Sequence, residues 1–344
     1  MRLSLLTLGG FALLLTTAPL LAQDEPEDTK PAEPKVVMTE ENKRAVEKAL
    51  AWMASRQQAN GSWNDQRNQW TTAITGFAMM AFMSAGNTPN RGEYAPVVAK
   101  GARYLLTVIR NDGYLAGPGG NMYCHGMATL ALAELWGMTG DEEVRGPLKK
   151  AIDLIQGCQS NEGGWRYEPR RTAGADISVT IMQVMALRAA RNGGMHVRDE
   201  VMKQALDYIF RCEDRQTGGF RYQPFGGPAG FARTSAAASA ILLAGEYQAK
   251  QIPRAIEFLK RSFNSREYFW YGHYYAAHAM HTTGGKDWAD WYERISQLLL
   301  TRQAPSGEWN DRGLDFSSPG PIYQTAIATI ILCIPNHYLP IYQR

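Results

Sequence analysis

Three short segments of the chain share one spacing, in which glutamine is followed four positions later by glycine and six positions later by tryptophan. They are residues 57–63, 159–165 and 303–309. Each segment follows an amphipathic stretch and precedes a more apolar one. A spacing that recurs in the same context indicates a repeat protein. The repeated unit is therefore expected to be helix, turn, helix.

The first helix of each unit is expected to be amphipathic. Residues 151–155, 205–209 and 255–259 read Ala-Ile-Asp-Leu-Ile, Ala-Leu-Asp-Tyr-Ile and Ala-Ile-Glu-Phe-Leu. Apolar residues at i, i+1, i+3 and i+4 form one stripe, and the acid between them faces water. These outer helices are predicted at residues 45–57, 99–109, 148–159, 202–212, 253–263 and 291–303.

The second helix of each unit is apolar on nearly every side, as in residues 236–243 and 327–332. Helices of this kind are buried. These inner helices are predicted at residues 71–85, 122–136, 177–190, 234–247, 273–281 and 323–334. An open solenoid would need a polar terminal cap, yet the last inner helix is as apolar as the central ones. The pattern therefore predicts an all-α fold, an α/α toroid of six outer and six inner helices, spanning residues 39–344.

The turn between the helices has a structural role of its own. Glutamine can hydrogen-bond the backbone at a helix end, glycine permits the tight turn, and tryptophan packs over it. With these residues in place, the segment resembles the QW repeat of squalene–hopene and oxidosqualene cyclases. The six helix pairs resemble the β subunits of protein prenyltransferases. This resemblance implies a central cavity, lined by the N-terminal parts of the inner helices, that holds isoprenoid chains.

The reaction signatures of those two families are absent. The cyclases of the squalene–hopene type protonate an alkene with Asp-x-Asp-Asp, whereas this chain offers only Asp176 at the start of the third inner helix. The prenyltransferases bind zinc through Asp-x-Cys and a later histidine, and no cysteine here has aspartate two positions before it. No metal or cofactor is therefore expected, and whether the protein is an enzyme stays open.

Two histidines mark a possible site. Aligning the inner helices places His125, Thr180 and His273 at one repeat position, which is expected to face the cavity mouth together with Asp176. His125, His273 and Asp176 are the candidates for acid–base chemistry, although a lone carboxylate at a helix start is commonly an N-cap. The residues expected to bind a ligand are Tyr123, Arg233, Trp270, Tyr274, Tyr275, Tyr323 and Gln324.

Three functions fit this pattern. Aromatic residues with a few polar groups favour a pocket for an apolar, isoprenoid-like molecule, unless they merely fill the ring. A carbohydrate-active enzyme would need two carboxylates across the cavity. A protein-interaction scaffold would need no pocket. Nucleic acid is not expected as a partner, because the formal net charge is only +3 and no basic stripe stands out.

The N-terminus has the pattern of an export signal. A basic start precedes an almost wholly apolar run, and Ala22 leads into an acidic, proline-containing stretch. This pattern predicts a signal peptide at residues 1–22, a disordered linker at 23–38 and a secreted or periplasmic protein. An uncleaved anchor is the alternative, and no later apolar run has membrane length. A bridge between Cys158 and Cys212 or a pair of buried thiols both fit an exported chain.

Overall fold

The computed structural model describes residues 35–64, 68–311, 313–315 and 317–343. The predicted signal peptide and most of the predicted linker lie outside the described residues. In the described part, the chain forms twelve α-helices, and strand-like pairing is confined to isolated bridges. The outer helices are α1 (Glu40–Ser55), α3 (Ala95–Val108), α5 (Glu142–Cys158), α7 (Asp199–Arg211), α9 (Gln251–Arg261) and α11 (Gly285–Arg302). The inner helices are α2 (Thr71–Ser84), α4 (Met122–Thr139), α6 (Ile177–Asn192), α8 (Phe231–Leu243), α10 (Phe269–Thr283) and α12 (Pro321–Cys333).

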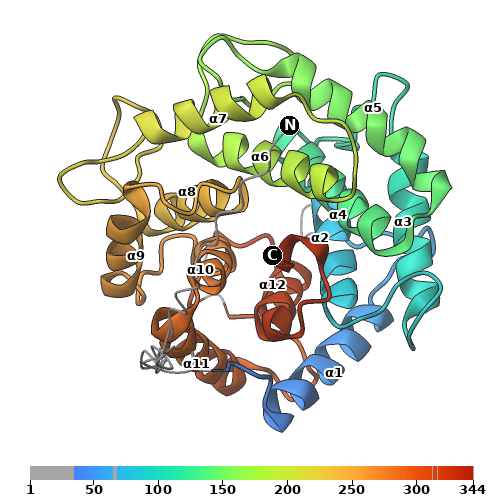
Figure 1. Ribbon diagram of the computed structural model, residues 1–344. Coiled ribbons are helices and arrows are strands. Elements are labelled where there is room, and N and C mark those ends of the chain that lie inside the picture. Colours follow the sequence, from blue (N-terminus) through green and yellow to red (C-terminus); the bar gives the residue numbers. More distant parts are fainter. Residues whose placement is uncertain (1–34, 65–67, 312, 316, 344) are drawn as a thin grey trace, which may run out of the picture. The chain divides into compact units, whose positions relative to one another are not determined.

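The inner helices form a closed ring inside the outer ones (Figure 1). Each inner helix packs against the next, and α12 packs against α2, which closes the ring. The outer layer closes as well, because the side chain Nε2 of Gln303 donates to the backbone carbonyl of Ala45 in α1 at 2.8 Å. The all-α toroid of six outer and six inner helices is therefore confirmed.

Burial follows the polarity of each helix type. In α7, Val201, Ala205 and Ile209 are buried, whereas Asp207 is exposed. The inner helices are buried on all sides because they lie between the outer helices and the axis of the ring. Most stability of such helices comes from packing of apolar surface rather than from helix propensity.

The glutamine–glycine–tryptophan turn joins three helices at once. The side chain Nε2 of Gln159 donates to the carbonyl of Gly163 and to the carbonyl of Val201 in α7, both at 2.8 Å. The indole Nε1 of Trp165 donates to the carbonyl of Ile155 in α5 at 2.7 Å. The backbone N–H of Trp165 donates to Oγ1 of Thr180 in α6 at 3.0 Å. The turns at 57–63 and 303–309 repeat these bonds.

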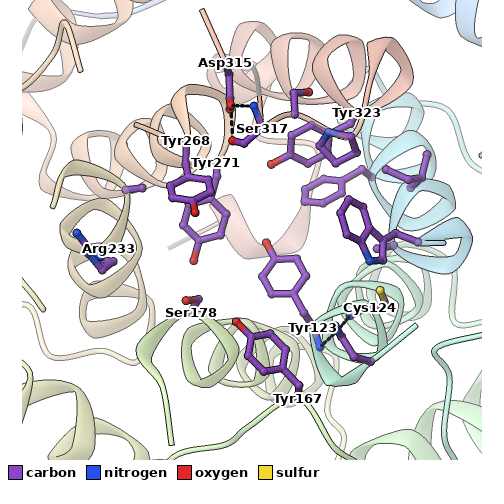
Figure 2. A pocket seen from close by; sticks show the side chains of 18 of the residues that line it. Tyr123, Cys124, Tyr167, Ser178, Arg233, Tyr268, Tyr271, Asp315, Ser317 and Tyr323 are labelled. Carbon is purple, nitrogen blue, oxygen red and sulfur yellow. Dashed lines mark hydrogen bonds between the residues drawn. The ribbon is translucent and has the colours of Figure 1, made fainter. Parts of the chain in front are cut away.

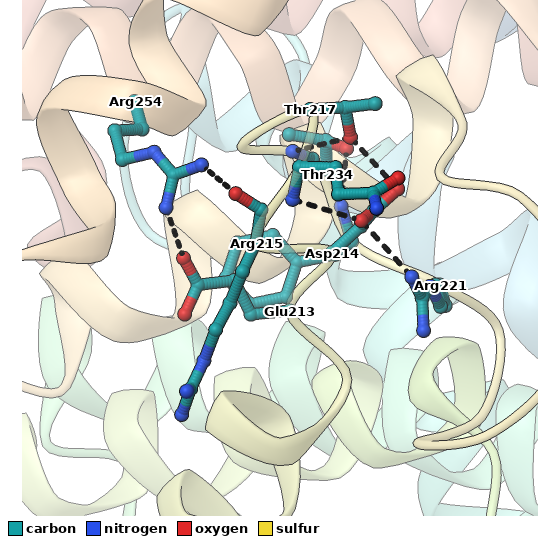
Figure 3. A network of polar contacts seen from close by, with 10 residues as sticks. Glu213, Asp214, Arg215, Thr217, Arg221, Thr234 and Arg254 are labelled. Atoms are coloured by element: carbon teal, nitrogen blue, oxygen red, sulfur yellow. Dashed lines mark hydrogen bonds and ion pairs between the residues drawn. The ribbon is translucent and has the colours of Figure 1, made fainter.

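The turn between α7 and α8 has no glutamine at the corresponding position and contains a network of ion pairs and hydrogen bonds instead (Figure 3). Arg254 of α9 reaches back to the carboxylate of Glu213 at 3.2 Å and to the carbonyl of Arg215. The carboxylate of Asp214 accepts from Thr217 at 3.0 Å and from Arg221 at 2.9 Å. The next outer helix is therefore held to this turn by charge rather than by an amide side chain.

The C-terminal segment folds back across the inner ring. It forms two short 3₁₀ helices, Ile334–Asn336 and Pro340–Tyr342, and the second packs on α4 and α6. Figure 1 shows this segment near the axis of the ring. The backbone N–H of Ile341 donates to Oε2 of Glu134, a residue in the C-terminal half of α4, at 3.1 Å. The segment therefore covers the C-terminal ends of the inner helices.

Two further observations bear on the sequence-based expectations. The four cysteines are buried thiols, so Cys158 and Cys212 are not bridged. Among the described helices, none has the length and hydropathy that a membrane span requires.

Candidate functional site

A cavity of about 470 Å³ lies at the N-terminal ends of the inner helices. Every inner helix, or the segment just before it, contributes to its wall, as Figure 2 shows. The C-terminal segment packs at the opposite ends of the inner helices, so this segment and the cavity lie at opposite faces of the ring. This placement matches the cavity that the sequence resemblance implies.

Most of the wall is aromatic or aliphatic. Trp70 and Phe77 lie on the α2 side, with Ala73 and Ile74 beside them. The phenol rings come from five inner helices or the loops before them. The six tyrosines are Tyr123, Tyr167, Tyr222, Tyr268, Tyr271 and Tyr323.

Burial keeps three of these phenols protonated. It raises the pKa of Tyr123, Tyr271 and Tyr323 well above the usual value of 10.0. A neutral phenol can donate one hydrogen bond and can also accept. The wall therefore combines apolar surface with hydroxyl groups, which is the composition expected of a small-molecule site.

Two carboxylates reach the cavity in different states. Glu267 forms an ion pair with Arg233, whose side chain lies 3.2 Å away. Asp315 is only 3% exposed, and its Oδ1 accepts from the backbone N–H of Ser317 at 3.0 Å and from the Ser317 hydroxyl at 2.5 Å. Among the described residues, no lysine or arginine forms an ion pair with Asp315. One negative charge of the wall is thus uncompensated by the described part of the chain.

Asp176 stands behind the wall rather than in it. Its Oδ1 accepts from the backbone N–H of Val179 at 3.0 Å, so it is the N-cap of α6. Burial raises the pKa of its carboxyl group, while this bond and the nearby hydroxyl groups of Tyr222 and Ser178 lower it less. Tyr222 in turn lies 3.1 Å from the hydroxyl oxygen of Tyr167. Asp176 therefore caps α6 beside these phenols, and its Oδ2 has no hydrogen-bond partner among the described residues.

The expected meeting of His125 and His273 at the rim is wrong. His125 Nδ1 accepts from the backbone N–H of Leu115 at 3.0 Å, and its Nε2 lies 3.3 Å from the carbonyl of Ala151 in α5. Neither histidine lines the cavity. The shared repeat position is real, because His125 holds its turn as Thr180 holds the turn at Trp165. That position faces the outer helices instead of the axis.

His273 is held in the same outward direction. Its Nε2 lies 3.1 Å from the carbonyl of Phe263, and aromatic rings surround it. Burial lowers the pKa of His273 to about 3 and that of His125 to about 4. Both imidazoles are neutral at neutral pH, and both connect the inner ring to the outer layer.

Replacing His125 by alanine is expected to lower the free energy of unfolding by about 2 kcal/mol, since a buried N–H and a buried carbonyl each lose a partner. Ligand affinity should not change, because the side chain does not line the cavity. The variant His125→Thr should recover part of the loss, since threonine serves the turns at Trp63, Trp165 and Trp309. Denaturation curves and ligand titrations measure both quantities; weakened binding with unchanged stability would restore His125 to the site.

The seven residues expected to bind a ligand divide into two groups. Tyr123, Arg233 and Tyr323 line the cavity. The other four are core residues: Trp270 and Tyr274 are 0% and 1% exposed. The hydroxyl of Tyr275 lies against the sulfur of Met182, and Gln324 bonds the loop before α12. The structure therefore brings together fewer of these residues than expected.

Several residues that line the cavity were not predicted from the sequence. Tyr167 and Tyr222 each stand two positions after the tryptophan or phenylalanine that ends a turn, in Trp165-Arg-Tyr and Phe220-Arg-Tyr. That repeated position was the signal that could have found them. Asp315 carries no such signal, because it lies in an irregular loop. Among the described residues, no three histidines, cysteines or acids gather in a way that could hold a metal ion.

Comparison with known proteins identifies the fold. No known family profile matches the chain, and no curated protein matches its sequence. Its structure is similar to a variant of the type II terpene cyclase MstE from Scytonema, in complex with its substrate geranylgeranyl dihydroxybenzoate. That match has a TM-score of 0.60 and 14% identity, and covers 87% of this chain and 98% of the cyclase.

Glycoside hydrolases share the architecture as well. The family 76 α-1,6-mannanase GH76A from Salegentibacter matches with a TM-score of 0.65 and 7% identity over 86% of this chain and 99% of the mannanase. A family 76 mannosidase from Bacteroides thetaiotaomicron matches with a TM-score of 0.62 and 12% identity, covering 86% and 97%. At these identities the likeness concerns the fold, and this chain has the α/α toroid that terpene cyclases and family 76 glycoside hydrolases share.

Proposed function

We propose that the protein binds an apolar, isoprenoid-like molecule in the cavity at the N-terminal ends of the inner helices. The observation that carries this proposal is the wall itself, where aromatic and aliphatic side chains surround a space of about 470 Å³. Sites for small molecules typically enclose about 300–1,000 Å³ and are mostly apolar. The similar fold of MstE, which holds a geranylgeranyl compound, supports the same ligand class.

The driving force would be the removal of hydrocarbon from water, worth about 0.8 kcal/mol for each buried methylene. The aromatic rings that line the cavity supply that contact. The contact needs no charged group on the ligand. No reaction is assigned, because the chain lacks the Asp-x-Asp-Asp sequence that protonates an alkene in the cyclases it resembles.

Replacing Phe77 by leucine is expected to weaken binding of farnesol about fivefold or more, since Phe77 lines the cavity and a hydrophobic contact of this size is worth about 1 kcal/mol. Phe82 is the matched control, because it is a fully buried phenylalanine of the same helix that packs on Trp63 and Tyr94 instead. Phe82→Leu should lower thermal stability without changing affinity. Equal affinity losses in both variants, or none in either, would contradict the assignment. Mass spectrometry of lipids extracted from the purified native protein gives an independent test.

A carbohydrate-active enzyme is the second candidate. It is favoured by two carboxylates, Glu267 and Asp315, that reach the same tyrosine-lined cavity, and by the fold shared with family 76 hydrolases. An inactive variant of that mannanase carries replacements at two consecutive aspartates, whereas this chain has no two consecutive aspartates. Hydrolysis of α-1,6-mannotriose that Asp315→Asn abolishes would favour this candidate over the first.

The cellular location that we propose rests on the N-terminal pattern. An exported chain would begin near Gln23, and N-terminal sequencing of the protein recovered outside the cytoplasm checks this. A mature protein that retains Met1 inside the cell would rule out export.

A further inference from the structure

One hydroxyl group in the cavity wall lacks a partner. The phenol oxygen of Tyr271, on α10, is buried and makes no hydrogen bond within the described residues. Its ring packs against Tyr275 and Tyr123, at centroid distances of 4.8 and 6.2 Å. Because burial raises the pKa of Tyr271 well above 10.0, the group keeps its proton. Leaving a buried donor unsatisfied is unfavourable, so the wall holds a donor that a ligand oxygen can satisfy.

The same wall also presents acceptors. The hydroxyl groups of Tyr222 and Tyr167 lie 3.1 Å apart, and either can donate to the other. A phenol oxygen accepts as well as donates. Tyr167 lines the cavity and can therefore accept from a ligand. Asp315, fixed by Ser317, is a second acceptor.

These groups face a common space. In Figure 2 the hydroxyl ends of Tyr123, Tyr167, Tyr271 and Tyr323 point toward the middle of the cavity. They come from α4, the loop before α6, α10 and α12. A single polar group of a ligand in that space therefore meets both donors and acceptors.

We infer that the cavity recognises a hydroxyl group on a neutral ligand, which accepts from Tyr271 and donates to Tyr167. This inference rests on the proposed function and narrows its ligand to an isoprenoid-like alcohol. A hydroxyl is the simple head group that can both accept and donate. A hydrocarbon would leave Tyr271 unsatisfied, and an ammonium ion has no lone pair to accept from it.

An anionic head group fits less well. The wall contains Asp315 and Glu267, and its arginine, Arg233, already pairs with Glu267. A carboxylate would meet the charge of Asp315 in a cavity of low dielectric constant, where like charges repel strongly. It also cannot donate the hydrogen bond that Tyr167 would accept.

The test uses four probes that share one fifteen-carbon chain: farnesol, farnesene, farnesoic acid and farnesylamine. Binding is followed by the fluorescence of Trp70 and the other tryptophans, with competition against a bound reporter. Farnesol is expected to bind roughly tenfold tighter than each of the other three, which is the effect of about one net hydrogen bond. Tyr271→Phe should abolish the preference for farnesol and leave the affinity for farnesene unchanged.

Tyr274→Phe is the matched control. Tyr274 lies on the same helix and its hydroxyl is also buried without a partner, but it does not line the cavity. The preference for farnesol should therefore survive in Tyr274→Phe. Loss of the preference in both variants, or in neither, would overturn the role of Tyr271.

The remaining outcomes separate this inference from the proposed function. Equal affinity for farnesol and farnesene in the native protein would overturn hydroxyl recognition while leaving an apolar ligand in place. If no fifteen-carbon probe binds, the apolar ligand is wrong, and α-1,6-mannotriose then tests hydroxyl recognition alone. Mannotriose binding that Tyr271→Phe weakens and Tyr274→Phe does not would support it; no binding of any probe would overturn both.

Discussion

Replacing Gly163 by alanine is expected to lower the free energy of unfolding by about 4 kcal/mol, through left-handed backbone strain and loss of hydrogen bonds at the turn. Gly163 has φ +94°, and an added Cβ would lie 2.2 Å from the carbonyl oxygen of Gln204 in α7. Backbone cannot rotate away as a side chain can. The turn must therefore move from α7, and the two bonds of Gln159 lengthen with it.

Gly174 provides the control for this prediction. It also has a positive φ of +79°, but nothing lies within 4 Å of an added Cβ. Gly174→Ala should therefore show the conformational cost alone, about 1 kcal/mol. Chemical denaturation of the two variants measures the difference. Equal losses would mean that the close approach of turn and outer helix does not contribute to the fold.

The close approach at Gly163 explains why the architecture could be predicted. Gly61 and Gly307 meet the carbonyls of Lys100 and Lys48 in the same way, at 2.2 and 2.5 Å. Each turn thus positions the outer helix of the next unit, and the third positions the first helix of the chain. The turn motif therefore predicts the repeated helix pairs, and the apolar last inner helix predicts that they close into a ring.

The orientation of the inner helices could not be obtained in this way. Such a helix is apolar on every side, so hydrophobic periodicity does not tell which residues face the axis and which face the outer layer. Alignment of the repeats correctly grouped His125 with Thr180. Only the bonds to Leu115 and Trp165 show that this position faces outward. The site predicted from the sequence therefore included residues on the wrong face of the inner helices.

Residues from irregular loops were beyond sequence reasoning for a different reason. Asp315 and Ser317 line the cavity from the loop before α12, and no periodicity governs that loop. Tyr123 and Tyr323, by contrast, lie in the first turn of their helices, where the predicted helix starts already placed them. The predicted helix starts thus identified Tyr123 and Tyr323, whereas Tyr271 on α10 and Phe77 on α2 were missed because the orientation of their helices was unknown.

The C-terminal segment leads to the second large effect, because it buries an acid. Glu134 is 0% exposed, its Oε2 accepts from the N–H of Ile341, and its Oε1 has no partner in the described part of the chain. Burial raises the pKa of Glu134 from 4.5 to about 8. Nearby, Tyr342 and His278 are joined by a hydrogen bond of 3.0 Å. Burial raises the pKa of Tyr342 well above 10.0 and lowers that of His278 to about 3, so both stay neutral at moderately alkaline pH.

The sign of the pH dependence follows from where the proton is held. The folded protein keeps the proton of Glu134 until about pH 8, whereas the unfolded chain releases it near its ordinary pKa of 4.5. Stability from this group is therefore complete below pH 4.5, falls as the pH rises toward 8, and stays level above that. The buried histidines change stability only below their unfolded pKa of about 6.5. Burial raises the pKa of the Cys158, Cys212 and Cys333 thiols from 9.0, so they lower stability only as the pH approaches 9. Measurements from pH 6.5 to about 8 therefore isolate Glu134.

Glu134→Gln is expected to make the protein more stable than wild type at pH 8.5, by on the order of 4 kcal/mol, since each pH unit between the two pKa values corresponds to about 1.4 kcal/mol. The amide oxygen can still accept from Ile341, and the amide never ionises, so the stability of the variant should be nearly flat from pH 6.5 to about 8. Glu143→Gln, at an exposed position of α5, should leave the wild-type slope intact. Denaturant unfolding across this pH range decides the matter. If Glu134→Gln keeps the wild-type slope, the carboxyl is ionised in the folded protein, and the C-terminal segment must then compensate a buried charge instead of covering a neutral acid.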